Sequence, residues 1–284
     1  MQPAHLDFDR RGLLKLFGLA AIAGGVPAQG LAIDASQRSI IARKLPWAGV
    51  LIETRDNALF IDAVAADPAR GEKAEVLAVT KPAHALITHN HGDHFSHDTV
   101  AGILGKDGLL VCQRAVFDWA DRRGLRVQPV DMWQPVFFPR YGDDIVAFAV
   151  PAVDGWGVPQ SSWVIDSAGV RIFHGGDTQW HGQFADIGRA YGPFDVAFLP
   201  INGARQQDGR FQDLGIPAVL TPEQAVAAAK LLHARLIVPI HYGHPDPPGY
   251  LETPDQIPRL TTAARDAGLA MRVLAVGESL TIAR

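Results

Sequence analysis

The sequence predicts a single α/β domain in which two β-sheets are covered on their outer faces by helices. Short apolar runs of strand length recur along the chain, and several are continuous rather than alternating, as in strands that are buried on both faces. Some of these runs follow one another directly and others alternate with helical segments, and this mixture favours two sheets. No linker, charge block or internal repeat divides the chain.

Eleven runs are predicted to form strands. In chain order they cover residues 50–54, 59–62, 85–88, 109–112, 145–150, 162–165, 170–173, 196–200, 236–240, 271–276 and 279–282.

Two segments carry clear helix signals. The first begins at Pro222 and places Val226, Ala229 and Leu232 on one face, with proline at its start, where its missing N–H is not needed. The second covers residues 261–267 and ends at Gly268. Residues 205–220 and 245–258 are predicted to be long loops, and loops of this length are often functional.

Composition limits the classes of function. The 284 residues include 48% hydrophobic and 20% charged residues, which excludes a disordered chain. The formal net charge of −4 leaves no global basic field, so we expect no nucleic acid among the partners. The composition does not exclude a homo-oligomer. Cys112 is the single cysteine, so a metal would have to be held by histidine and carboxylate groups.

The first residues do not read as part of this domain. Arg10 and Arg11 are followed by an apolar run at 16–26 that is too short to span a bilayer, and small residues come next. This pattern resembles a twin-arginine (Tat) signal peptide over residues 1–28, cleaved after Ala28. The resemblance implies a periplasmic or extracellular protein with no stable membrane anchor after cleavage. The alternative is a frayed amphipathic arm.

A dense group of histidines follows the third predicted strand. The stretch Thr-His-Asn-His-Gly-Asp-His contains His89, His91, Asp93 and His94. Metal binding needs imidazoles and carboxylates that converge to about 2 Å from one point, and a tight loop at a strand end can provide this. The alternative is a polar turn that caps a helix near Ser96. It is disfavoured because buried groups of this kind are costly without partners.

This stretch resembles the His-x-His-x-Asp-His signature of the metallo-β-lactamase superfamily, and the resemblance covers residues 40–284. It implies an α/β, four-layer αββα sandwich, the metallo-β-lactamase fold, with two mixed sheets flanked by helices. It also implies that His89 and His91 bind one metal and that Asp93 and His94 bind a second.

Later motifs occur in the family's order. Asp177, in Gly-Gly-Asp-Thr, is similar to the aspartate that bridges both metals, and His241, at a strand end, matches the last ligand of the second metal. One motif departs: where the family has Val-Pro-Ala-x-His, this chain has Asp154. A carboxylate can bind zinc and also suits manganese or iron, so Asp154 is either a ligand or turned away.

Within the superfamily, the chain looks most like the branch that contains L-ascorbate-6-phosphate lactonase and the N-acyl-phosphatidylethanolamine phospholipase D type. The motifs are the Pro-Ile-Asn-Gly turn at 200–203, the helix opening at 221–225 and Pro-Ile-His-Tyr-Gly at 239–243. The resemblance implies an exported metal-dependent hydrolase that attacks an ester, lactone or phosphodiester of a small-molecule substrate with a metal-bound hydroxide. Two divalent metal ions are expected, with zinc first and manganese or iron as alternatives.

Within this scheme Asp93 and Asp177 are the expected catalytic residues. Asp177 would bridge the metals, and Asp93 would orient the nucleophile or accept a proton. The competing interpretations are a mononuclear site, or a non-catalytic metal- or ligand-binding protein on the same scaffold. Asp62 is expected to support the histidine loop without binding metal. The candidate substrate-binding residues are Trp156, His181, Arg205, Tyr242 and His244.

Overall fold

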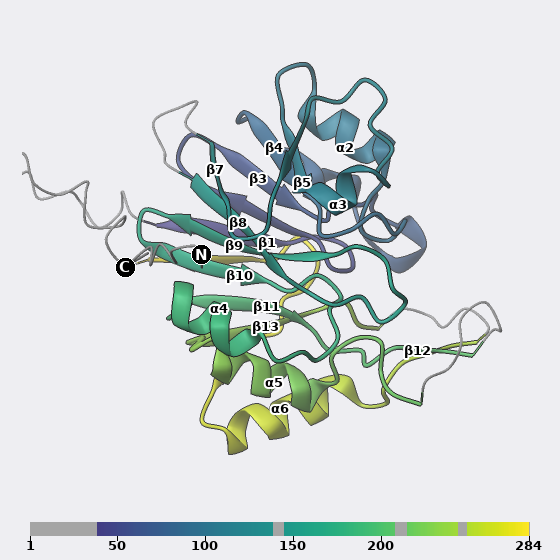
Figure 1. The fold of residues 1–284 in the computed structure, drawn as a ribbon, viewed down its shortest axis with the longest axis vertical. Coiled ribbons are helices and arrows are strands. Elements are labelled where there is room, and N and C mark those ends of the chain that lie inside the picture. The colour runs from purple at the N-terminus through teal and green to yellow at the C-terminus, as the bar shows by residue number, and fades with distance from the viewer. Residues whose placement is uncertain (1–38, 139–144, 208–214, 244–248, 284) are drawn as a thin grey trace, which may run out of the picture. The chain divides into compact units, whose positions relative to one another are not determined.

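Two seven-stranded sheets form the centre of the computed structural model, which describes residues 39–138, 145–207, 215–243 and 249–283 (Figure 1). The first sheet has the order β16 (Ser279–Ile282), β1 (Ile40–Lys44), β2 (Val50–Glu53), β3 (Ala58–Ile61), β4 (Ala83–Leu86), β5 (Leu110–Gln113) and β6 (Val127–Val130). The second has the order β15 (Ala270–Met271), β13 (Leu236–Ile240), β11 (Val196–Pro200), β10 (Val170–His174), β9 (Ser161–Ser167), β8 (Ile145–Pro151) and β7 (Pro135–Phe138). β12 (Arg205–Gln206) and β14 (Tyr250–Leu251) form a separate two-stranded pair.

Both sheets are mixed. In the first sheet β3, β4, β5 and β6 are mutually parallel, and β16, β1, β2 and β3 alternate in direction. In the second sheet β10, β11, β13 and β15 are parallel, and β8 runs in the same direction because it and β10 both pair antiparallel with β9. The carboxyl ends of β8, β10, β11 and β13 therefore meet at one edge of the second sheet.

Three apolar clusters separate the layers. One draws on both sheets, with Ile52 and Leu86 from the first and Ile172 and Phe198 from the second, so the sheets pack face to face. The second cluster lies between the second sheet and α4 (Phe184–Tyr191), α5 (Pro222–Leu231) and α6 (Gln256–Asp266). The third lies between the first sheet and α2 (His97–Leu104), α3 (Arg114–Phe117) and the short 3-10 helix η3 (Ala74–Leu77). Another short 3-10 helix, η2, covers Pro68–Arg70.

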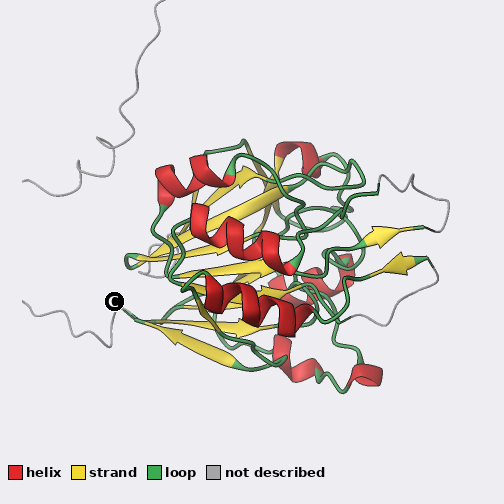
Figure 2. Ribbon diagram, turned by 90° about the horizontal axis from the view of Figure 1, so that it is seen from below, coloured by secondary structure: helices red, strands yellow, loops and turns green. Residues whose placement is uncertain are grey.

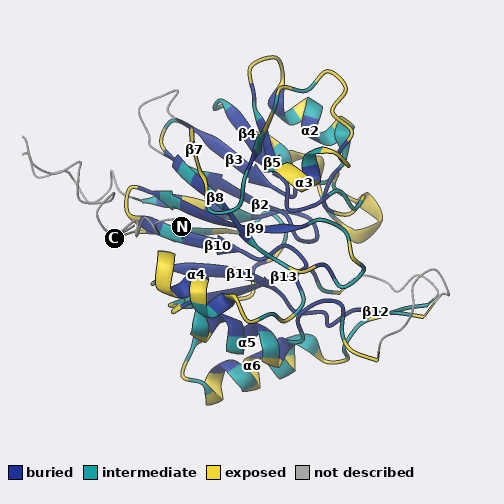
Figure 3. Ribbon diagram, in the orientation of Figure 1, coloured by how far each residue is buried: buried dark blue, intermediate teal, exposed yellow. Residues whose placement is uncertain are grey.

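These layers confirm the αββα sandwich. Figure 2 shows helices on the outer side of the strands, and Figure 3 shows that the strands are buried while the outer faces of the helices are exposed. Because burial on both faces demands apolar side chains along a whole strand, the continuous apolar runs were the correct signal for β3 and β11. No helix of the described residues is long and apolar enough to cross a membrane. The leader expected over residues 1–28 lies outside the described part of the chain.

Three predicted boundaries are wrong. The helix expected at 261–267 begins five residues earlier, at Gln256. The expected loop 245–258 ends early because α6 already begins at Gln256; Pro258 is its third residue, where a helix makes no use of the N–H. Of the strand expected at 271–276, only Met271 lies in β15, and the chain then crosses to the first sheet. The apolar signal there comes from Leu274, which is buried in the cluster between the sheets.

α5 begins as predicted, and its start has a clear cause. The hydroxyl of Thr221 accepts a hydrogen bond from the Gln224 N–H, and the Gln224 side chain accepts one from the Thr221 N–H. This capping box satisfies two N–H groups that the helix itself cannot, and Pro222 occupies the first helical position.

Candidate metal centre

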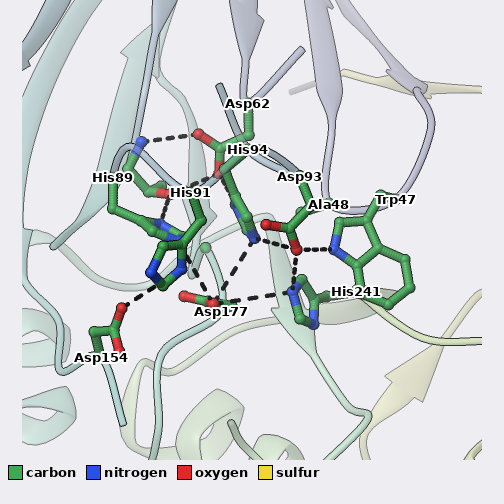
Figure 4. Close-up of polar contacts among 12 residues, drawn as sticks. Trp47, Ala48, Asp62, His89, His91, Asp93, His94, Asp154, Asp177 and His241 are labelled. Atoms are coloured by element: carbon green, nitrogen blue, oxygen red, sulfur yellow. Dashed lines mark hydrogen bonds and ion pairs between the residues drawn. The ribbon is translucent and has the colours of Figure 1, made fainter. Parts of the chain in front are cut away.

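Four loops that follow strand ends bring the predicted ligands together (Figure 4). His89, Asp154 and Asp177 each lie three residues beyond the last residue of β4, β8 and β10 respectively, and His241 directly follows β13. Because β8, β10 and β13 run in the same direction, the loops that follow them meet at one edge of the second sheet, and the loop after β4 of the first sheet lies against them there. The centre thus lies at the edge of the sandwich, with ligands from both sheets.

The first group of side chains is His89, His91 and Asp177, whose candidate ligand atoms lie within 4.8 Å of one another. His89 Nε2 is 2.9 Å from His91 Nδ1 and 3.6 Å from Asp177 Oδ2. Asp154 lies on the His91 side of this group, with its Oδ2 3.8 Å from His91 Nδ1. Its other oxygen accepts a hydrogen bond from the Trp156 N–H.

The second group is Asp93, His94 and His241, also within 4.8 Å of one another. Asp93 Oδ2 is 3.7 Å from His94 Nε2 and 3.6 Å from His241 Nε2. Asp177 Oδ2 is 3.9 Å from His94 Nε2 and 4.0 Å from His241 Nε2. One carboxylate oxygen of Asp177 therefore lies beside both groups.

Several of these atoms are buried without a hydrogen-bond partner. They are His94 Nε2, Asp154 Oδ2, Asp177 Oδ1 and both ring nitrogens of His241. An unpartnered buried polar atom is costly, whereas imidazole nitrogens and carboxylate oxygens are the ligands that zinc takes in proteins. The residues present therefore fit divalent cations.

The electrostatics of the centre favour added positive charge. Burial raises the pKa of Asp177 to about 8, and the nearby carboxylates of Asp154 and Asp93 act in the same direction. Burial alone would lower the pKa of His94, but the carboxylates around it raise that pKa to about 10. Burial lowers the pKa of His241 to about 4, which keeps this ring in the neutral form that binds metals.

Asp62 supports the histidine loop, as the sequence analysis expected. It directly follows β3, and its two carboxylate oxygens accept hydrogen bonds from the Thr88 N–H at 2.8 Å and the Thr88 hydroxyl at 2.7 Å. Its Oδ2 also lies 2.8 Å from His94 Nδ1. The Ser96 hydroxyl accepts a hydrogen bond from the Thr99 N–H and so caps the start of α2. The loop between β4 and α2 therefore carries the candidate ligands and also leads into a capped helix.

The candidate substrate residues have different positions. The ring of Trp156 is 6.2 Å from that of His91, at the side of the first group. His181 stacks on Phe184 at 4.0 Å, and Tyr242 packs against the cluster beneath the helices. Arg205 lies in β12. His244 lies outside the described residues.

Trp47 is the residue that the sequence analysis did not identify. It lies in the turn between β1 and β2, and its indole N–H donates to Asp93 Oδ2 at 2.9 Å. Its ring centroid is 4.2 Å from that of His241. Trp47 lies in an apolar turn about forty residues before the histidines. Nothing in the sequence pattern signals that it would contact Asp93 or His241.

Comparison with known proteins agrees with the fold. Residues 57–242, more than half of the chain, match the family model described as "Beta-lactamase superfamily domain". A UPF0173 metal-dependent hydrolase of Thermococcus kodakarensis is 30% identical over 182 residues, covering 62% of this chain and 72% of the relative. One from Anoxybacillus flavithermus is 29% identical, covering 82% and 96%. The solved structure of Igni18, a metallo hydrolase from Ignicoccus hospitalis, aligns with a TM-score of 0.64 at 20% identity, covering 86% of this chain and 98% of that one.

Proposed function

Because the chain belongs to the beta-lactamase superfamily, we propose that it is a metal-dependent hydrolase of small-molecule esters, lactones or phosphodiesters with two divalent cations, zinc first among them. The observation that carries the proposal is the position of Asp177 Oδ2 beside both His89 Nε2 and His94 Nε2. A single buried oxygen in contact with two ligand groups is what a shared ligand of two metals requires.

The ligands divide between the two groups. His89, His91 and Asp154 are assigned to the first cation, Asp93, His94 and His241 to the second, and Asp177 to both. When bound, such cations supply Lewis acidity that makes water a nucleophile near neutral pH and stabilises negative charge on the substrate.

Asp93 and Asp177 have different tasks in this proposal. The side chain of Asp177 is buried, at 2% exposure, so it is suited to holding metals. The side chain of Asp93 is 49% exposed and can meet both substrate and solvent. We therefore assign proton transfer and orientation of water to Asp93. Trp156, beside His91, is the candidate wall for an apolar part of the substrate.

The assignment of Asp154 separates the two-metal proposal from a mononuclear one. Its Oδ2 is buried, has no hydrogen-bond partner and lies 3.8 Å from His91 Nδ1. A carboxylate oxygen in that state is suited to a cation, so the replacement of imidazole by carboxylate leaves the first group complete. We expect the additional negative charge to lower the Lewis acidity of the first cation.

The test is metal content together with turnover. The full chain is purified without chelator, its metals are counted by elemental mass spectrometry, and p-nitrophenyl acetate, a γ-lactone and bis(p-nitrophenyl) phosphate are offered as substrates. We expect about two metals per chain and hydrolysis of at least one substrate. H91A should lose one metal and its turnover, while H97A, in the same histidine-rich segment, should keep both. One metal in the unaltered chain would favour the mononuclear site, and none after zinc or manganese addition would contradict the proposal.

The proposed place of action is the periplasm or the extracellular space. This rests on the Arg10-Arg11 pair and the apolar run that follows it. In a bacterial host, fractionation should recover a shortened protein outside the cytoplasm, without a stable membrane anchor. Changing both arginines to lysine should retain the full-length chain in the cytoplasm. Full-length, cytoplasmic protein from the unaltered sequence would contradict this part of the proposal.

A further inference from the structure

The turn between β1 and β2 reaches from the first sheet into the second ligand group. Its central residue, Trp47, is 8% exposed. The indole Nε1 donates to Asp93 Oδ2 at 2.9 Å, and the ring lies 4.2 Å from the His241 ring (Figure 4). The Trp47 carbonyl oxygen also accepts a long hydrogen bond, 3.4 Å, from the His241 N–H. A residue from a turn of the first sheet thus contacts two of the three side chains in this group.

Of the three side chains in that group, Asp93 is the only one that is not enclosed by the protein core. His94 and His241 are 0% and 1% exposed, whereas the Asp93 side chain is 49% exposed. The oxygen that receives the indole N–H is Oδ2, the same oxygen that faces both imidazoles. An indole nitrogen can only donate, so it orients this carboxylate without becoming a ligand itself.

The backbone of the turn is held in a conformation that an aromatic residue rarely adopts. Trp47 has φ +54°, in the left-handed region, and such residues persist only where their surroundings hold them. The buried Lys44 Nζ donates to the carbonyl oxygens of Leu45 and Trp47. His174 Nε2, from β10, donates to the Ala48 carbonyl at 2.9 Å. Contacts from both sheets therefore fix where the indole points.

We infer that Trp47 is a positioning residue for the second metal: its indole N–H holds Asp93 Oδ2 in the place where that oxygen joins His94 and His241. The inference rests on the proposed function, because it requires a metal in the second group. Hydrogen-bond partners of metal ligands typically change metal affinity by 10- to 100-fold.

The test compares two tryptophan-to-phenylalanine variants. W47F keeps a packed ring but removes the N–H that reaches Asp93. W163F is the matched control: Trp163 is fully buried, and its indole donates at 3.0 Å to the Ile87 carbonyl, close to the histidine loop but not to a ligand. Zinc affinities of the metal-free full chain are measured by competition with a chromophoric chelator, and the melting temperature of the metal-free form is measured alongside.

We expect W47F to lower the affinity for one of the two zinc ions by 10- to 100-fold and to change the affinity for the other by less than about twofold. W163F should lower the melting temperature and leave both affinities unchanged. In an H241A background, which disables the second group, W47F should have no further effect on the remaining equivalent, as expected when two residues act on one site.

Two results would overturn the inference. One is a W47F variant that binds both zinc ions as tightly as the unaltered protein. The other is equal weakening of both equivalents with a fall in melting temperature as large as that of W163F, which would make Trp47 merely structural. Failure of the proposed function looks different: the unaltered chain itself would then lack a second zinc equivalent.

Discussion

The Nδ1 atom of His94 lies 2.8 Å from Oδ2 of Asp62, and this contact sets the direction in which the imidazole faces. With Nδ1 engaged, the ring presents Nε2 to Asp93 and Asp177. A carboxylate behind a histidine ligand fixes its tautomer and raises its basicity. Because the same carboxylate also binds Thr88, it couples the end of β3 to the loop that follows β4.

Replacing Asp62 by asparagine tests this relationship. The variant keeps the size of the side chain, but an amide cannot accept from both donors of Thr88 and from His94. We expect D62N to weaken zinc binding to the second group by 10- to 100-fold, measured by chelator competition. D56N, at a partly exposed carboxylate paired with Arg55, serves as the control. Unchanged zinc affinity in D62N would show that the contact does not tune the metal.

Asp154 can be tested by restoring the imidazole that the family motif carries. If the carboxylate is a ligand, D154H should raise zinc affinity at the first group, and D154A should lower it, because zinc prefers imidazole at such positions. Calorimetric titration of the metal-free protein gives both values. D131A, which removes an exposed carboxylate paired with Arg114, should leave the affinities for both zinc ions unchanged. Equal affinities in all three variants would place Asp154 outside the coordination sphere.

Gly176 precedes Asp177 at a tightly packed position with a left-handed backbone. Its φ is +65°, and a Cβ there would lie 3.0 Å from both Thr88 Cβ and Gln160 Nε2. G176A should lower the free energy of unfolding by about 1–3 kcal/mol and reduce metal content by displacing Asp177. Gly169 has φ +83° and open space around it, so G169A should lower the free energy of unfolding only through the strained backbone conformation. Urea titration distinguishes them, and equal losses would contradict the close-packing argument.

Lys44 predicts a pH dependence of stability. Burial lowers its pKa to about 7, Arg70 adds to this, and Glu72 opposes it. Below pH 7 the amine is protonated in both the folded and the unfolded chain, and burying its charge lowers the free energy of unfolding by the full amount. From pH 7 towards 10.5 the unfolded chain binds more protons than the folded one, so stability increases with pH.

K44M should remove this contribution. Between pH 7 and 9, the free energy of unfolding of the unaltered protein should rise by about 2 kcal/mol relative to that of K44M. Denaturant titrations at several pH values measure the difference. K81M is the control, since Lys81 is partly exposed and also donates to a backbone carbonyl. Parallel pH curves for the unaltered protein and K44M would contradict the prediction.

The fold and most of the candidate site could be predicted because their signals are local. Two-sided burial leaves continuous apolar runs, and His89, His91, Asp93 and His94 lie within six residues of one another. Asp177 and His241 each follow such a run, but they were recognisable only because their motifs occur in the order that the resemblance to the metallo-β-lactamase superfamily implies.

Other features depend on contacts between distant residues. Trp47 meets Asp93 only because the fold brings the turn after β1 against the loop that follows β4. Leu274 appeared to belong to a strand, but it is apolar because it fills the space between the sheets as the chain crosses over. No local pattern distinguishes these cases, since the same residue types serve a strand, a turn or a crossover.

The ligand loops divide between the two sheets. Residues 89–94 follow β4 of the first sheet, while Asp154, Asp177 and His241 follow strands of the second. In the proposed two-metal state each cation is therefore a cross-link between the halves of the sandwich. When the folded state binds a metal and the unfolded state does not, metal at a thousandfold excess over its dissociation constant adds about 4 kcal/mol to the free energy of unfolding. The supply of metal where the chain folds would then govern how long the protein survives heat and proteases, as well as whether it can catalyse a reaction.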